Sequence, residues 1–99
     1  MRDLPEIEYK PENLFSIASS HADLMERMIG DFIYLRAGTP NGMSARRWRK
    51  ILLKIEEGFA AVDPLMNTFG LSDKRRNKLC KKFDKGMELF VKYYFDLWY

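Results

Sequence analysis

Three long stretches of apolar residues with a helical spacing dominate this sequence and most constrain its fold. In each stretch, apolar side chains recur every three or four positions, which places them along one face of a helix of period 3.6. Glycine-containing turns separate the stretches, at Gly38 to Gly42 and at Gly70. We therefore predict an all-α fold, an antiparallel three-helix bundle in a single domain. The predicted ranges are 1–99 for the domain and 13–37, 44–69 and 72–98 for the helices.

The residues between and before these stretches set their limits. Residues 1–12 contain Pro5 and Pro11 and show no sustained period, which predicts an extended N-terminal segment. Ser44 and Ser72 stand just before the second and third stretches, where a serine side chain satisfies free backbone N–H groups. We therefore predict that these two serines are N-caps.

Pro64 is the weak point of the second predicted helix. A proline inside a helix removes the hydrogen bond to the residue four positions earlier, here Ala60, and crowds its carbonyl. The helix therefore either kinks near Asp63 or ends there, and we favour a break with Asp63 as cap and Pro64 at the first position of a new helix. Gly58 adds local flexibility or allows another helix to approach closely.

The residue counts limit the chemistry available to the chain. Cys80 is the only cysteine and His21 the only histidine, so one chain can form neither a disulfide nor a Cys/His zinc site. His21 falls on an apolar stripe, which favours a core or boundary residue over a general base, and a buried thiol is expected for Cys80. We therefore expect no enzyme activity, no cofactor and no metal site.

Length limits the class of protein, and hydropathy bears on its location. The 99 residues suffice for one core but not for a separate deep substrate cavity, which excludes a large multi-domain enzyme. No apolar run approaches the roughly 18 residues of a membrane span, and the first residues lack the pattern of a signal peptide. We therefore expect a cytoplasmic protein without a membrane partner.

The net charge of +3 hides an uneven distribution, because residues 1–31 are acidic and the remainder is strongly basic. Basic blocks open the second and third helices, which should lie at opposite ends of an antiparallel bundle. Cations there oppose the helix dipole, which favours an anionic partner over the alternative of a solubilising face. The turn between the first two helices is a further candidate anion site. The candidate anion or nucleic-acid contacts are Arg36, Thr39, Arg46, Arg47, Arg49, Lys50, Arg75, Arg76 and Lys78.

Aromatic residues gather at the C-terminal end, where the last ten residues hold six of them. They do not share one helical face, and a three-helix core needs only one stripe from each helix. Some should therefore remain exposed as anchors for a protein partner, unless the N-terminal segment covers them. The candidate interface residues are Trp48, Tyr93, Phe95, Trp98 and Tyr99.

Two segments carry a resemblance to a known group of proteins. Residues 48–59 contain Trp-x-x-Ile-Leu and a Gly-Phe pair, and the aromatic run over 83–98 ends in Leu-Trp. With these motifs, the chain resembles short uncharacterised helical proteins encoded by bacteriophages. The resemblance implies a small accessory phage protein of the bacterial host cytoplasm, and it implies no particular activity.

Together, these patterns predict a non-enzymatic phage accessory protein that binds a host or phage macromolecule, in counter-defence or host takeover. The expected partner is a protein or a second copy of the chain, as in a homo-oligomer. The alternative is nucleic-acid or nucleotide binding through the basic helix starts, which salt should weaken steeply.

Overall fold

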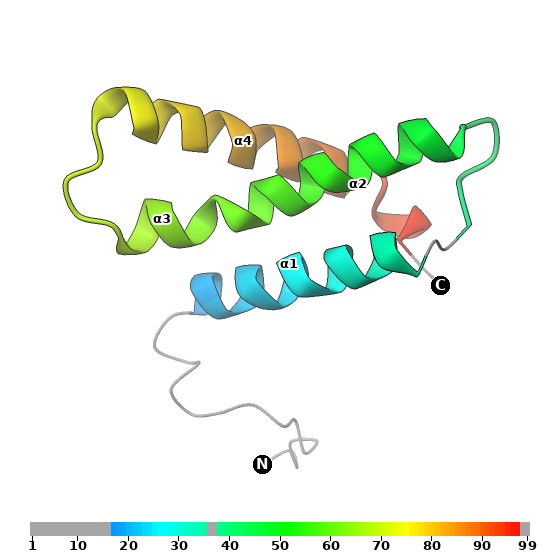
Figure 1. The fold of residues 1–99 in the computed structure, drawn as a ribbon, viewed down its shortest axis with the longest axis horizontal. Helices are drawn as coiled ribbons and strands as arrows, with labels where there is room; N and C mark the ends of the chain where they lie inside the picture. Colours follow the sequence, from blue (N-terminus) through cyan, green and yellow to red (C-terminus); the bar gives the residue numbers. More distant parts are fainter. Residues whose placement is uncertain (1–16, 36–37, 98–99) are drawn as a thin grey trace, which may run out of the picture.

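The computed structural model describes residues 17–35 and 38–97. They form four α-helices, namely α1 (Ile17–Tyr34), α2 (Ala45–Ala60), α3 (Val62–Asn67) and α4 (Asp73–Lys92), and a short 3-10 helix, η2 (Tyr94–Asp96). In Figure 1, α2 lies between α1 and α4, runs opposite to α4, and is continued by α3. These packed helices confirm the predicted all-α bundle. The predicted extended segment and positions 13–16 of the first predicted helix lie outside the described residues.

Serine caps begin α2 and α4, as predicted. The hydroxyls of Ser44 and Ser72 each accept the backbone N–H three residues later, at 3.1 Å and 3.2 Å. Gly42 and Gly70 precede them with φ angles of 79° and 72°, a left-handed conformation that glycine adopts without strain. Each helix start therefore combines a glycine turn with a side-chain cap.

The second predicted helix breaks at Ala61, which separates α2 from α3 and is the N-cap of α3. The predicted cap was wrong, because Asp63 lies inside α3, where its carboxylate accepts a hydrogen bond from the Asn67 side chain at 2.8 Å. Pro64 occupies the third position of α3, not the first. Its missing N–H still falls in the first turn, where no intrahelical acceptor exists, so the proline fits without loss of a bond inside α3.

The third predicted helix is shorter than expected. α4 ends at Lys92, and the chain tightens into η2, where backbone N–H groups bond three residues back instead of four. The Tyr93 ring packs edge-on against Trp48 at 5.5 Å between centroids. The aromatic end of the chain therefore turns onto the start of α2.

The core is organised around α2. Ile55, in the middle of α2, has 0% of its surface exposed, and α1 and α4 contribute fewer buried side chains than α2 does. The buried apolar side chains of α2 are Trp48, Ile51, Leu52, Ile55 and Phe59. Because these positions span one side of the helix and part of its flanks, α2 holds α1 and α4 at the same time.

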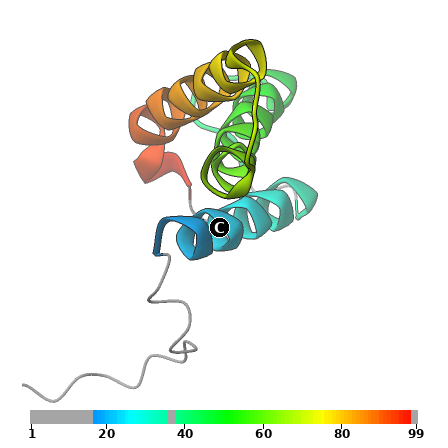
Figure 2. The same ribbon diagram turned by 90° about the vertical axis from the view of Figure 1, so that its left-hand side faces the viewer.

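α2 and α4 cross at two glycines. A Cβ at Gly86 would lie 2.6 Å from the Cα of Gly58, closer than real Cβ atoms come. The prediction that Gly58 allows a close helix approach is therefore confirmed. By contrast, α1 packs on α2 and α3, and no Cα atom of α1 lies within 8 Å of a Cα atom of α4. Figure 2 shows this arrangement from one end, with α1 and α4 apart.

Candidate functional site

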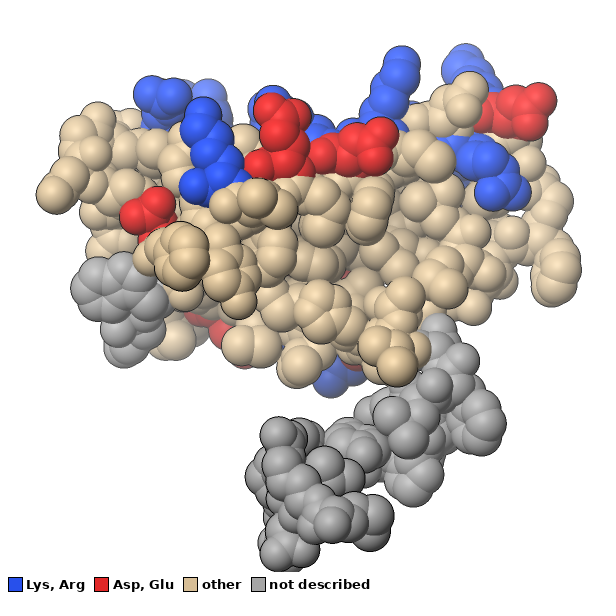
Figure 3. Space-filling view, turned by 180° about the vertical axis from the view of Figure 1, so that it is seen from behind, with Lys and Arg blue, Asp and Glu red and all other residues tan. Residues whose placement is uncertain are grey.

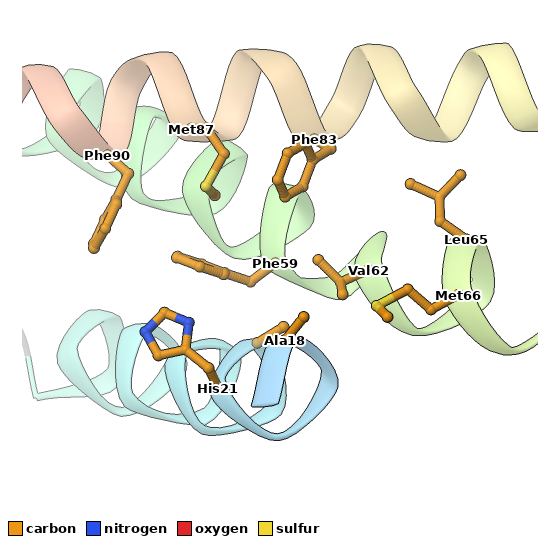
Figure 4. Close-up of a pocket in the computed structure, with 10 residues that line it drawn as sticks. Ala18, His21, Phe59, Val62, Leu65, Met66, Phe83, Met87 and Phe90 are labelled. Carbon is orange, nitrogen blue, oxygen red and sulfur yellow. The ribbon is translucent and has the colours of Figure 1, made fainter. Parts of the chain in front are cut away.

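An apolar groove lies between α1 and α4, because both pack on α2 while their own backbones stay more than 8 Å apart, measured between Cα atoms. Its volume is about 360 Å³. Figure 4 shows Phe59 between the two helices and α3 at one end, with the α4 side chains pointing toward those of α1. The aromatic, histidine and methionine side chains that line the groove are His21, Phe59, Met66, Phe83, Met87 and Phe90. Nearly all of this lining is hydrocarbon, aromatic ring or thioether.

A row of edge-to-face rings crosses the groove. His21 of α1 meets Phe59 at 5.9 Å between centroids, and Phe59 meets Phe90 of α4 at 5.1 Å. The row continues through Tyr94 and Phe95 at 5.3 Å and 5.5 Å. Such geometry stabilises each pair beyond its buried area. The groove floor is therefore organised without a ligand.

The apolar surface extends beyond the groove, because α1 is apolar on two faces. Ala22 and Ile29 are buried against α2, whereas Leu24 and Met28 are each 54% exposed. The single buried stripe predicted for this helix was therefore wrong. Eight large apolar side chains on or next to α1, α3, the end of α4 and η2 are more than half exposed, and we call these and the groove lining the groove face. They are Ile17, Leu24, Met28, Leu35, Met66, Val91, Tyr94 and Phe95.

Figure 3 shows the molecule from the side of the groove face, which is largely free of charged side chains. Lysine and arginine line the edge that α4 forms, with acidic side chains between them. The charges therefore border the apolar surface and do not cross it. An apolar patch with a polar border is typical of a protein-binding site.

The predicted interface residues differ in how far the structure exposes them. Phe95 is 90% exposed and belongs to the groove face, whereas Trp48 is 2% exposed and lies in the core. Tyr93 is half-buried against Trp48, so the start of α2 and the chain end cover each other. Trp48 is therefore removed from the docking candidates. Trp98 and Tyr99 lie outside the described residues.

The groove lining was missed by the sequence analysis. Phe59, Phe83, Met87 and Phe90 were assigned to core stripes, since helical spacing alone does not tell which stripe meets another helix. One pattern in the sequence did indicate the site. The apolar residues of α1 span about half of the helix circumference, more than one helix contact can bury.

The predicted anion site in the turn before α2 is only partly assembled. Arg36 lies outside the described residues, and Thr39 is exposed. The N–H of Arg47 already donates to the Ser44 cap, so it is not available to an anion. Arg46 and Arg49 instead border a hollow of about 420 Å³ next to Trp48, whose indole N–H has no partner in the described part of the chain. Arg47 and Lys50 are exposed.

A cluster of basic side chains lies at the start of α4, at the opposite end of the bundle from the start of α2 (Figure 1). Lys74, Arg75, Lys78 and Lys82 surround a hollow of about 400 Å³ beside Leu79. Arg76 is exposed but does not line this hollow. The ion pairs formed by described residues are Arg27 with Asp23 at 2.6 Å and Lys85 with Glu88 at 3.8 Å. The four cations therefore have no carboxylate partner within the described ranges.

Groups that could support catalysis are dispersed. Cys80 is exposed, so the prediction of a buried thiol was wrong: α1 does not cover the side of α4 on which it lies. His21 is also exposed and packs its ring on Phe59. Residues 17–35 and 38–97 bring together no three His, Cys, Asp or Glu side chains able to hold a metal ion. In the same ranges, each helix is too short or too polar to cross a membrane.

One carboxylate near the α1–α2 contact is perturbed. Burial raises the pKa of Glu56 above its ordinary value of 4.5, and the nearby charges of Glu26 and Glu57 raise it further. The Glu56 carboxylate lies over the backbone of Gly30, where an added Cβ would be 2.9 Å from its Oε2. This group therefore opposes the packing of α1 on α2 slightly when it is charged.

Comparisons with protein families, with curated proteins and with solved structures find no match to this chain. Any function proposed for this chain therefore rests on the groove face and on the basic side chains at the starts of α2 and α4.

Proposed function

We propose that this chain is a non-enzymatic interaction protein that binds an amphipathic helix of a partner protein in the groove between α1 and α4. The observation that supports this most is the apolar groove, together with the eight exposed apolar side chains of the groove face. Together with the phage resemblance, it suggests an accessory phage protein that acts on a host or phage protein in the host cytoplasm, in counter-defence or host takeover.

The shape and chemistry of the groove favour a helix as the bound element. Two helices form its walls, and a third helix laid between them would pack side chains into both, as helices do in bundles. Met66 and Met87 line it with flexible thioether side chains, which adapt to ligands of different shape. α4 carries eight lysines and arginines against three acidic residues, so acidic residues beside the apolar stripe of the partner helix would be favourable.

A displayed library of amphipathic helical peptides tests this function. Selected peptides should share apolar residues at positions i, i+3, i+4 and i+7. Met66 lines the groove and is exposed, so Met66→Glu should weaken peptide binding at least about tenfold, measured by fluorescence anisotropy. Leu53→Glu is the control, because Leu53 is exposed on α2 and does not line the groove. Equal binding by both variants would contradict the proposal.

Nucleic-acid binding is a second candidate function, favoured by the cluster of Lys74, Arg75, Lys78 and Lys82. These cations surround one hollow and lack carboxylate partners among the described residues. The lysines at 74, 78 and 82 follow one face of α4 at intervals of one helical turn. A phosphate backbone is an anion that could contact several such cations at once.

Labelled single-stranded and double-stranded oligonucleotides test this second function. Binding should weaken steeply with added salt, and Arg75→Glu together with Lys78→Glu should abolish it. The matched control is Arg47→Glu together with Lys50→Glu, which changes the same charge at the opposite end of the bundle. Salt-independent binding, or equal loss in both double variants, would exclude a site at this cluster.

A further inference from the structure

We propose that a second copy of this chain closes the groove face, in a twofold dimer in which α1 of each copy packs against α4 of the other. This inference rests on the proposed function, since it assigns an occupant to the same face. The apolar lining of the groove and the basic charge of α4 favour an amphipathic helix with exposed apolar residues and an acidic flank. α1 itself has both properties.

The exposed side of α1 has the spacing of a helix–helix seam. Ile17, His21, Leu24 and Met28 lie at intervals of four, three and four residues. The next two positions of this alternation are Asp31 and, just beyond the end of the helix, Leu35. Side chains with this spacing form a straight stripe that packs into the holes of a facing helix. The stripe is separate from the one that α1 buries against α2. α1 is therefore equipped for a further helix contact, besides those that it makes with α2 and α3 of its own chain.

The area of the exposed surface matches the needs of a stable dimer. Each of the eight exposed side chains of the groove face leaves on the order of 100 Å² accessible, or about 800 Å² in all. A standard interface buries about 800 Å² on each partner. The largest apolar patch of a typical monomer is about 300–600 Å². A second copy would therefore remove from water an apolar surface larger than monomers usually expose.

Charge decides which helices face each other. α1 carries three carboxylates against one arginine, whereas α4 carries eight lysines and arginines against three carboxylates. Packing α4 on α4 would bring two strongly basic helices together, while packing α1 on α4 brings opposite charges together at both ends of a twofold interface. The second arrangement is the attractive one. A partner helix then has to compete with the second copy for the groove.

The oligomeric state of the full chain in solution tests the dimer. Light scattering over about a hundredfold range of concentration should show the mass of two chains at the high end and dissociation on dilution. Met28 lies in the exposed stripe of α1, and Met28→Glu should raise the dissociation constant at least about tenfold. Added salt should weaken the dimer moderately, because opposite charges face each other.

Tyr34→Glu is the matched control, since Tyr34 is on the same helix, is 83% exposed and faces away from the stripe. It should leave the dimer intact, and circular dichroism should show both variants folded. A wild-type chain that is monomeric throughout, or equal association of the two variants, overturns the dimer. Association that appears only after removal of residues 1–16 also overturns it, because those residues would then be the occupant. A monomer that still binds peptides through Met66 would overturn the dimer alone and leave the proposed function standing.

Discussion

The two sides of α4 are packed in opposite ways. On one side, α4 crosses α2 so closely that the Cα atoms of Gly58 and Gly86 leave no room for a Cβ. On the other side, no Cα atom of α4 lies within 8 Å of one of α1, and large apolar side chains line the gap. The difference shows that side-chain size decides how closely the helices of this chain pack. Two glycines let backbones meet, whereas phenylalanine and methionine at the groove hold the helices apart and leave apolar surface for another molecule.

The largest difference in stability should appear between truncation of a core side chain and truncation of a side chain of the groove face. Ile55 is fully buried, so Ile55→Ala should lower the free energy of unfolding by about 3 kcal/mol, through lost burial and the cavity that remains. Met28→Ala should change it by less than about 0.5 kcal/mol in the dilute protein, because Met28 is mostly exposed. Urea denaturation measures both values, and similar losses would show that the groove face is part of the folded core.

The glycine crossing gives the next largest effect. Gly86→Ala places a Cβ 2.6 Å from the Cα of Gly58, so the helices must separate, at a cost of about 2 kcal/mol. The control is Gly30→Ala, whose Cβ would meet only the movable Oε2 of Glu56 at 2.9 Å. There the better helix propensity of alanine should stabilise the protein by about 0.5 kcal/mol. Thermal unfolding of the two variants in opposite directions is the expected outcome, and stabilisation by Gly86→Ala would refute the close crossing.

Loss of the α4 cap should lower the free energy of unfolding by a smaller amount. Ser72→Ala removes the acceptor of a backbone N–H at 3.2 Å and should cost about 1 kcal/mol in urea denaturation. Ser72→Asp should retain the stability, since its carboxylate accepts the same N–H and is favourable at a helix N-terminus. Equal loss in the two variants would mean that the hydroxyl does not act as a cap.

The smallest effect concerns Glu56, at the contact of α2 with α1. Because its pKa is raised in the folded protein, the folded state binds the proton more tightly than the unfolded state. This contribution to stability is full below the unfolded pKa and is lost as the pH rises through the folded pKa. At pH 7, Glu56→Gln should therefore stabilise the protein by a few tenths of a kcal/mol, by removing a partly buried charge and its repulsion from Glu26 and Glu57.

Melting temperatures of wild type and Glu56→Gln, measured from neutral pH down to about pH 4, check this sign. The gap between them should shrink toward acid. A gap that is constant with pH, or a less stable variant at pH 7, would show that charge on Glu56 does not oppose folding.

The ends of helices were predictable where local chemistry sets them. Ser44 and Ser72 begin α2 and α4 because a hydroxyl satisfies free N–H groups within the same turn, independently of the rest of the fold. The break before Pro64 was predicted for the same local reason, but its position was not. Ala61 separates the two helices, since a proline is tolerated at any position of a first turn. α4 ends at Lys92, next to Tyr93, whose ring packs on Trp48. This contact joins residues far apart in the chain, and local spacing does not encode it.

The sequence by itself determined the all-α fold and the serine caps of α2 and α4, because both follow from residue type and helical period. For Gly58 it left flexibility and a close helix approach as alternatives, and the contact with Gly86 decided between them. Only the tertiary structure decided which apolar stripe each helix buries. Leu24 and Ile29 share the apolar sector of α1, yet one faces solvent and the other the core. The reason is geometric: a helix contact covers only part of the helix circumference, and the position of α2 selects which part.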